Sequence, residues 1–157
     1  MKVAVFSDSH GSWRGMADVV RSYCPDQVIH LGDGYDDAMR LAREFPLIPV
    51  CAVPGNCDHD CTEPDYKVIK LGGLTFFLTH GHRYAVRYGK LDTLLYAAEC
   101  SGAQVAMFGH THRAGYDQIG GIFVVNPGTA GRTPNRTWAR LELGDKGEVS
   151  CTIENIE

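Results

Sequence analysis

Two histidines separated by one residue, His110 and His112, follow a short apolar run and a glycine. Two imidazoles at this spacing can point the same way, which is a start for a transition-metal site. Other apolar runs of the chain also end in side chains that can bind a metal. The full set of candidate ligands is Asp8, His10, Asp33, Asn56, His80, His110 and His112. Oxygen and nitrogen ligands without a thiolate suit Mn²⁺, Fe, Ni²⁺ or Zn²⁺, and seven ligands suit two ions that share a carboxylate.

The position of these side chains along the chain predicts that they meet. Each follows a run that is typical of a buried strand, and these runs are Lys2–Phe6, Gln27–Leu31, Leu47–Val53, Leu74–Thr79 and Val105–Phe108. In open α/β sheets, ligands bind beyond the carboxyl ends of the strands, so residues far apart in sequence can converge there. Pro49 makes the third run the least regular strand, because proline cannot donate to a ladder.

The remaining periodicity predicts helices and hairpins around these strands. Helices are expected from Ser12, as the N-cap, to about Tyr23, from a cap at Asp36 or Asp37 to about Glu44, and over 91–100, with a polar loop at 84–90. The first third therefore reads β-α-β-α-β, which favours a parallel sheet. The runs expected to pair as antiparallel hairpins are 66–71 with 74–79, 115–119 with 122–125, and 136–143 with 149–153. A mixed α/β fold is predicted.

Composition narrows the possible functions. The chain has 157 residues, 44 % of them hydrophobic, and a net charge of −4. This charge gives no long-range attraction for nucleic acid or an anionic membrane. No apolar stretch approaches the length of a membrane span, and nothing at the N-terminus resembles a signal peptide, so we expect a cytoplasmic protein. The six cysteines lack C-x-x-C spacing and are expected to be reduced thiols.

The motifs in order resemble those of the calcineurin-like metallophosphoesterases. They are Asp8-x-His10, Gly32-Asp33, Gly55-Asn56, His80 and Gly109-His110-x-His112. The resemblance runs from Asp8 to about Thr129. The small YfcE-like phosphodiesterase branch is similar in particular, through Gly55-Asn56-Cys57-Asp58, His80-Gly81-His82 and Asn126-Pro127-Gly128.

This resemblance implies a fold and a metal centre. It implies one domain over residues 1–157, a four-layer α-β-β-α sandwich of two packed mixed sheets flanked by helices. Asp8, His10 and His112 would hold one divalent ion, Asn56, His80 and His110 a second, and Asp33 would bridge both. Manganese is the first expectation, with nickel, iron and zinc as alternatives. The implied activity is a hydrolase, a phosphodiesterase that uses in-line attack of a bridging hydroxide on phosphorus.

One departure from the family pattern concerns the general acid. Many members carry a histidine directly after the Gly-Asn pair, where it protonates the leaving group, and this chain has Cys57. His59 and His82 are possible substitutes, and we place them with Asn56 and Asp33 in the candidate catalytic set. His30, inside an apolar strand, is expected to be a hydrogen-bonded core histidine. Asp58 is expected to orient a neighbouring side chain.

Alternative functions remain open at this point. The retromer's phosphoesterase-like subunit resembles this family and serves as a protein-binding scaffold, which makes a scaffold the second hypothesis. A phosphomonoesterase or nuclease is a third. We expect a small phosphate ester as the partner and rank nucleic acid below it. We expect no membrane contact, and we leave open whether the chain forms a homo-oligomer. Four arginines next to the motifs could bind phosphate or be solvated: Arg83, Arg87, Arg113 and Arg132.

Overall fold

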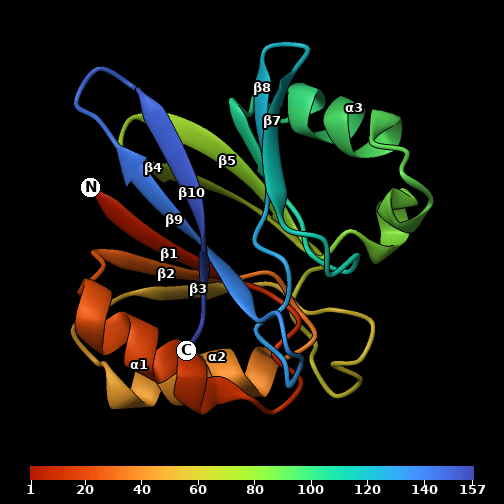
Figure 1. The fold of residues 1–157 in the computed structure, drawn as a ribbon. Helices are drawn as coiled ribbons and strands as arrows, with labels where there is room; N and C mark the ends of the chain where they lie inside the picture. The colour runs from red at the N-terminus through yellow and green to blue at the C-terminus, as the bar shows by residue number, and fades with distance from the viewer.

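A computed structural model describes residues 1–157 and contains two five-stranded sheets packed face to face (Figure 1). The strands are β1 (Lys2–Phe6), β2 (Gln27–His30), β3 (Val50–Ala52), β4 (Tyr66–Leu71), β5 (Leu74–Thr79), β6 (Val105–Met107), β7 (Gly115–Ile119), β8 (Ile122–Asn126), β9 (Thr137–Leu143) and β10 (Val149–Asn155). The helices are α1 (Trp13–Tyr23), α2 (Tyr35–Glu44) and α3 (Asp92–Cys100), with 3₁₀ turns η1 (His82–Tyr84) and η2 (Val86–Tyr88).

Both sheets mix parallel and antiparallel strands, as predicted. The first has the order β10-β9-β1-β2-β3, in which β1, β2 and β3 are parallel and β9 runs antiparallel to β1. The second has the order β4-β5-β6-β8-β7, with β5, β6 and β8 parallel. Helices α1 and α2 cover the outer face of the first sheet, and α3 covers the second (Figure 1). The predicted four-layer α-β-β-α sandwich is confirmed.

The apolar strands are continuous because both of their faces are buried. In β1, Val3 and Val5 enter the core between the sheets, whereas Ala4 and Phe6 pack under the helices. The same alternation occurs in β6, where Val105 faces the core between the sheets. A strand covered on both sides carries no polar stripe. This packing fixes the strand ends, from which the candidate ligands project.

Local predictions differ from the structure at several boundaries. Strand β3 is shorter than predicted and begins after Pro49. Helix α2 begins after Gly34, so the predicted caps Asp36 and Asp37 lie within its first turn. Ser12 is the N-cap residue of α1, but its side chain makes no capping hydrogen bond. The polar loop predicted at 84–90 contains part of η1 and the whole of η2.

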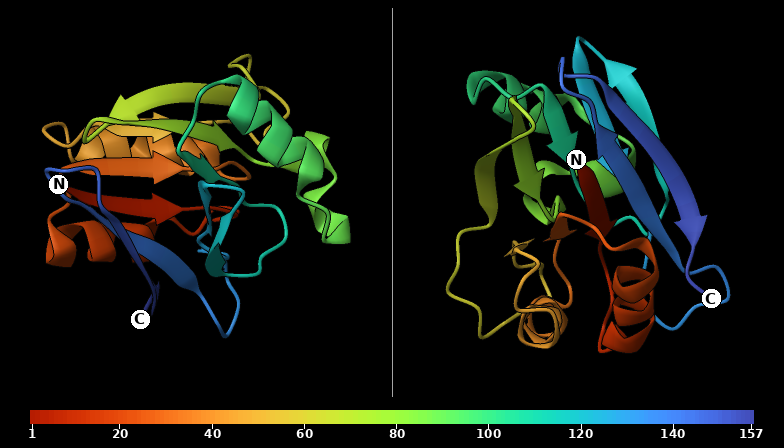
Figure 2. Two further views of the ribbon diagram at one scale, coloured as in Figure 1. Left: turned by 90° about the horizontal axis from the view of Figure 1, so that it is seen from above. Right: turned by 90° about the vertical axis from the view of Figure 1, so that its left-hand side faces the viewer.

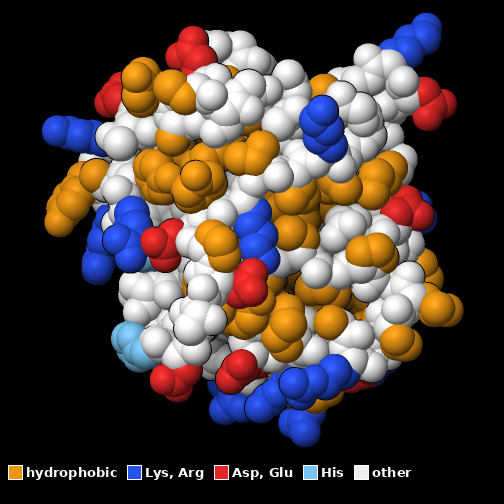
Figure 3. Space-filling view, turned by 180° about the vertical axis from the view of Figure 1, so that it is seen from behind, with side chains coloured by type: hydrophobic (Ala, Val, Ile, Leu, Met, Phe, Trp, Pro, Cys, Tyr) orange, Lys and Arg blue, Asp and Glu red, His pale blue; other side chains and the backbone are white.

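Several large apolar side chains are exposed on the surface. Seen from behind, apolar side chains form patches separated by charged and polar ones (Figure 3). The most exposed large apolar side chains are Leu47, Tyr88 and Tyr96. No helix has the length and apolar character needed to span a membrane. All six cysteines are free thiols.

Candidate metal centre

The candidate ligands occupy loops at one end of the two sheets. In Figure 2 (left) the arrowheads of β1 and β2 point to the same end of the molecule. Backbone hydrogen bonds join neighbouring loops within each sheet: the Asp8 N–H donates to the Gly32 carbonyl in the first sheet, and the Gly109 N–H donates to the His80 carbonyl in the second. Parallel strands thus deliver residues from distant parts of the sequence to one place.

Asp8 is fully buried, and its two carboxylate oxygens differ. Oδ2 accepts hydrogen bonds from the Ser7 hydroxyl at 2.5 Å and from the His110 N–H at 3.0 Å. Oδ1 is buried and has no hydrogen-bond partner. It lies 3.2 Å from His112 Nε2 and 3.9 Å from His80 Nε2. A buried carboxylate oxygen without a partner is costly, and a cation between these three atoms would remove that cost.

His80 is held in the orientation and tautomer that suit a metal ligand. Its Nδ1 donates to the Leu31 carbonyl at 2.7 Å, which leaves the Nε2 lone pair facing the carboxylates. Nε2 is buried without a hydrogen-bond partner and lies 3.5 Å from Asp33 Oδ2. Burial favours a lower pKa for His80, but Asp33 and Asp8 outweigh it and the pKa is raised.

Asp33 lies between two groups of candidate ligands. Its Oδ2 is 3.8 Å from His10 Nε2 and 3.5 Å from His80 Nε2, while its Oδ1 accepts the Cys57 N–H at 2.8 Å. Burial favours a higher pKa, but His80 and the Cys57 N–H hold the pKa of Asp33 well below its usual range. A carboxylate placed between two histidines in this way has the position needed to serve two ions.

The seven candidates cluster around these two carboxylates. The ligand atoms of Asp8, His10 and His112 lie within 4.8 Å of one another, and so do those of Asp8, Asp33 and His80. The His110 ring lies 5.0 Å from the His80 ring, between centroids. Partial burial and His80 lower the pKa of His110, which keeps it neutral and able to bind a metal. Asn56 lines the same cleft as His10, Asp33, His110 and His112.

The backbone is strained at five of these residues. Positive φ angles occur at Asp8 (54°), His10 (44°), Asp33 (53°), His110 (66°) and His112 (58°). Left-handed backbone in non-glycine residues is uncommon and collects at functional sites. Only two other non-glycine residues of the chain share it. The strain therefore marks the site independently of its side-chain chemistry.

Two glycines allow the loops to approach so closely. A Cβ at Gly109 would lie 1.8 Å from Ser7 Oγ, and one at Gly55 would lie 2.2 Å from Asp33 Oδ1. Both contacts are closer than real atoms permit, so these positions require glycine. The glycines of the Gly-His and Gly-Asn motifs thus have a packing role beside the ligands.

A second set of residues holds the loops, and the sequence predicted their roles only in part. Asn126 donates to the Gly109 carbonyl and to Thr111 Oγ1, and its own Oδ1 accepts from the Gly128 N–H. Asp58 accepts from the N–H groups of Gly34, Tyr35 and Gly55, so it orients backbone where a side-chain partner was predicted. The only sequence signal for Asn126 is its place in the Asn-Pro-Gly motif.

Behind the site lies a buried polar chain. His30 is hydrogen-bonded, as predicted, through Nε2 to the Ser9 hydroxyl at 3.1 Å and through Nδ1 to the Gly32 N–H. The Ser9 hydroxyl donates to Asp37 at 2.7 Å. Burial lowers the pKa of His30 to about 4, so this histidine is neutral at pH 7. The chain braces the loop between Asp8 and His10.

The candidate general acids are placed differently from one another. The Cys57 thiol lies within 4.8 Å of ligand atoms of His10 and Asp33. Partial desolvation and the Asp33 carboxylate raise its pKa to about 11, so it is protonated at pH 7. His59 lines a neighbouring pocket with Cys57, and His82 packs behind the site, 5.5 Å from the His80 ring. Neither histidine lines the main cleft.

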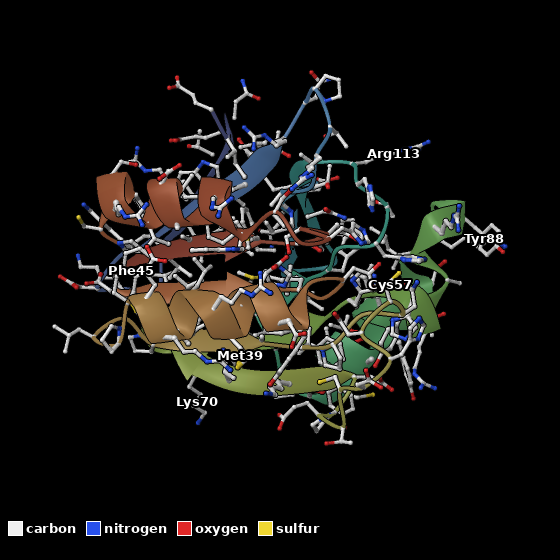
Figure 4. All side chains as sticks on the ribbon, turned by 90° about the horizontal axis from the view of Figure 1, so that it is seen from below. Met39, Phe45, Cys57, Lys70, Tyr88 and Arg113 are labelled. Carbon is white, nitrogen blue, oxygen red and sulfur yellow. The ribbon has the colours of Figure 1, made fainter.

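The structure also separates the four arginines. Arg87 and Arg113 line the main cleft. Arg83 pairs with Asp65 at 2.5 Å, and Arg132 lies in a small pocket beside α1. Cys57, Tyr88 and Arg113 come from three loops at the same end of the molecule, whereas Lys70 and Phe45 lie far from it (Figure 4).

Comparison with known proteins identifies the family. Residues 1–146 match the model of the calcineurin-like phosphoesterase superfamily domain. The chain belongs to this family. The Bacillus subtilis protein named probable metallophosphoesterase YsnB is 33 % identical over 131 residues, covering 82 % of this chain and 75 % of that protein. A protein of Methanocaldococcus jannaschii named as a phosphodiesterase is 26 % identical over 147 residues, covering 82 % and 83 %.

Solved structures share the architecture. A conserved protein of Streptococcus pneumoniae, described as a predicted phosphoesterase, superimposes with a TM-score of 0.77 at 25 % identity, over 98 % of this chain and 97 % of that one. Vps29 of Entamoeba histolytica, solved in complex with Zn²⁺, superimposes with a TM-score of 0.74 at 23 % identity over the whole of both chains. The resemblance to metallophosphoesterases predicted from the motifs is therefore confirmed, and the family is one of metal-dependent phosphoric ester hydrolases.

Proposed function

We propose that this metallophosphoesterase is a phosphodiesterase with a dinuclear centre, which hydrolyses phosphate diesters by in-line attack of an activated water on phosphorus. The observation that supports it most is the pair of buried, partnerless atoms Asp8 Oδ1 and His80 Nε2, 3.9 Å apart. Such atoms are rare in folded proteins unless an ion or water completes them. Their donor types suit a divalent transition metal.

The division into two sites follows the family resemblance, and it is supported by the close approach of Asp8, His10 and His112 and by the closeness of His80 to Asp33 and to the His110 ring. Asp8, His10 and His112 would hold one ion, and Asn56, His80 and His110 the other, with Asp33 shared between them. Carboxylate, amide and imidazole ligands without a thiolate suit manganese, which is our first choice, and they also suit nickel, iron and zinc. Two divalent ions bound there would lower the pKa of a shared water and stabilise charge on the attacking and leaving oxygens.

The chain's own groups prepare this chemistry. The Ser7 hydroxyl and the His110 N–H fix Asp8, and the Leu31 carbonyl fixes His80, so the ligands need little rearrangement. The Asn56 amide, which lines the cleft, can also donate to a phosphoryl oxygen. Cys57, with a pKa of about 11, is a weak acid for a departing alkoxide. Leaving groups that need no protonation, such as p-nitrophenolate, should therefore react best.

A metal-by-substrate screen tests the proposal. The purified protein is stripped with a chelator, reloaded with Mn²⁺, Ni²⁺, Fe²⁺ or Zn²⁺, and assayed with bis(p-nitrophenyl) phosphate, p-nitrophenyl phosphate and cyclic nucleotides. We expect the aryl diester to be the best substrate. No hydrolysis of it with any metal would refute the proposal. His112→Ala should remove one equivalent of bound metal, and His110→Ala should weaken the other, as measured by metal analysis.

The second candidate is a protein-binding scaffold. Its support is the fold likeness to Vps29. If the protein is a scaffold that binds no metal, added metal does not change its free energy of unfolding. An ion that binds only the folded state, at a free concentration of 100 times its Kd, raises that free energy by about 2.7 kcal/mol. For a chain of this length that energy raises Tm by roughly 5–10 °C. No shift with any metal, together with no hydrolysis, would favour the scaffold.

A further inference from the structure

The cleft beside the candidate ligands is larger than a phosphate requires. Its volume is about 670 Å³, and it is open to solvent along the metal-ligand loops. Volumes of this size are typical of pockets for whole small molecules. Val86, Leu91 and Phe108 contribute apolar surface to the lining, which suits a carbon body attached to the phosphate. The cleft therefore has room for more of a substrate than its reacting group.

Two arginines line this cleft without a carboxylate partner. Arg87 comes from η2, and Arg113 directly follows His112. Some surface arginines are instead paired within the chain: Arg83 pairs with Asp65, and Arg140 pairs with Glu142. The single carboxylate that lines the cleft is Asp33, which belongs to the candidate metal centre. The guanidinium groups of Arg87 and Arg113 are thus free to bind an anion.

Charge on the other side of the centre has the opposite sign. A neighbouring pocket of about 410 Å³ begins at Cys57 and is lined by Asp36, Asp58 and Asp60. None of these three carboxylates forms an ion pair with a lysine or arginine, whereas Glu63 in the same pocket pairs with Lys67. A long polyanion running from the cleft past Cys57 would meet these charges, which disfavours a nucleic acid strand.

We propose that the substrate is a small phosphate ester with a second anionic group, and that Arg87 and Arg113 bind that group while the ester phosphate lies at the metal centre. The inference rests on the proposed function and narrows its substrate class. The second anion is a phosphate or carboxylate, because a guanidinium binds either through paired N–H donors. The other ester substituent, on the side of the aspartates, is uncharged or cationic.

Two substrates that differ by one phosphate test this inference. They are thymidine 5′-(p-nitrophenyl phosphate) and the same compound with a 3′-phosphate. Both release p-nitrophenolate from the same ester, so a difference reports binding of the additional anion. We expect the 3′-phosphate to lower KM about tenfold with little change in kcat. The double variant Arg87→Ala/Arg113→Ala should bring the ratio of the two KM values close to one.

The matched control is Arg83→Ala, which removes a positive charge from the adjacent turn η1 but lies outside the cleft lining. It should keep the tenfold ratio, which excludes a general effect of net charge. Equal KM values for the two substrates with the unaltered protein would overturn the inference, and so would a tenfold ratio that survives in the double arginine variant.

A binding measurement keeps the inference separable from the proposed function. Calorimetry with the manganese-loaded protein compares thymidine 3′,5′-bisphosphate with thymidine 5′-monophosphate. We expect about tenfold tighter binding of the bisphosphate, lost in the double arginine variant. If neither chromogenic ester is hydrolysed but this difference is found, the anion site stands and the diesterase activity fails. Equal affinities overturn the anion site, whatever the activity.

Discussion

Replacing Asp8 by asparagine should stabilise the metal-free protein. Asp8 is fully buried, and its Oδ1 has no hydrogen-bond partner. In Asp8→Asn the amide oxygen can take the place of Oδ2 and accept from the Ser7 hydroxyl and the His110 N–H. The amide N–H₂ then takes the place of Oδ1, 3.2 Å from His112 Nε2, to which it can donate. The variant thereby removes an unpartnered buried charge and gains a hydrogen bond.

The magnitude follows from the cost of an unsatisfied buried group, about 1–3 kcal/mol. For a chain of this length, each kcal/mol moves Tm by about 2–4 °C. Asp8→Asn in excess chelator should therefore melt roughly 2–12 °C above the unaltered protein. With Mn²⁺ the order should reverse, because the unaltered protein gains binding energy that the amide cannot provide.

Differential scanning calorimetry of both proteins, with chelator and with Mn²⁺, measures the two effects. Asp117→Asn is the control, because Asp117 is exposed and forms no ion pair, so its Tm should stay close to that of the unaltered protein under both conditions. A lower Tm of Asp8→Asn in chelator would refute the reasoning about the buried carboxylate. An undiminished manganese shift would refute its role as a ligand.

Three further predictions concern the residues around this carboxylate. Asp33 and Asp8 raise the pKa of His80 above 6.5, so a proton competes with the metal for Nε2. Below that pKa, calorimetry should show that the affinity for Mn²⁺ falls about tenfold per pH unit and that binding of the metal releases a proton. Asn126→Ala leaves the Gly128 N–H without its hydrogen-bond partner and removes one of the two donors to the Gly109 carbonyl, which also accepts from the Thr111 N–H. Denaturant titration should show a loss of about 1–3 kcal/mol, and metal titration should show an affinity about 10–100-fold weaker. Cys57→Ala should keep most of the activity on bis(p-nitrophenyl) phosphate, because a thiol with a pKa of about 11 contributes little as an acid. A thousand-fold loss of activity in a steady-state assay would instead show that the thiol takes part in the reaction.

The order of motifs made the site predictable from the sequence. Asp8, Asp33 and His80 each follow an apolar run, and parallel strands bring such positions together without further information. Continuous apolar runs also made these strands recognisable, because both of their faces are buried. What the runs do not encode is where an element begins and ends. Strand β3 is short because Pro49 precedes it, and α2 begins at Tyr35, after Gly34, where the Asp58 carboxylate accepts from the N–H groups of Gly34 and Tyr35.

The supporting residues were unpredictable for a different reason. Asn126 and Asp58 act through hydrogen bonds to backbone groups that are distant in sequence, and no local pattern distinguishes such residues from ordinary turn formers. The arginines show the same limit. Arg83 and Arg87 are four residues apart and chemically identical, yet one is paired with Asp65 and the other faces the cleft. Only the tertiary structure separates them.

The left-handed backbone at the ligands connects these observations. Among non-glycine residues, aspartate, asparagine and histidine tolerate positive φ best, and the strained ligands are two aspartates and three histidines. The residue types that bind the metal are thus also those that the tight loops can accept. Leu or Val at His110 would lose the ligand and add backbone strain, whereas Gly would lose the ligand and relieve it. In the metal-free protein, His110→Gly should therefore be more stable than His110→Val, which locates the cost of the site in its backbone as well as in its buried charge.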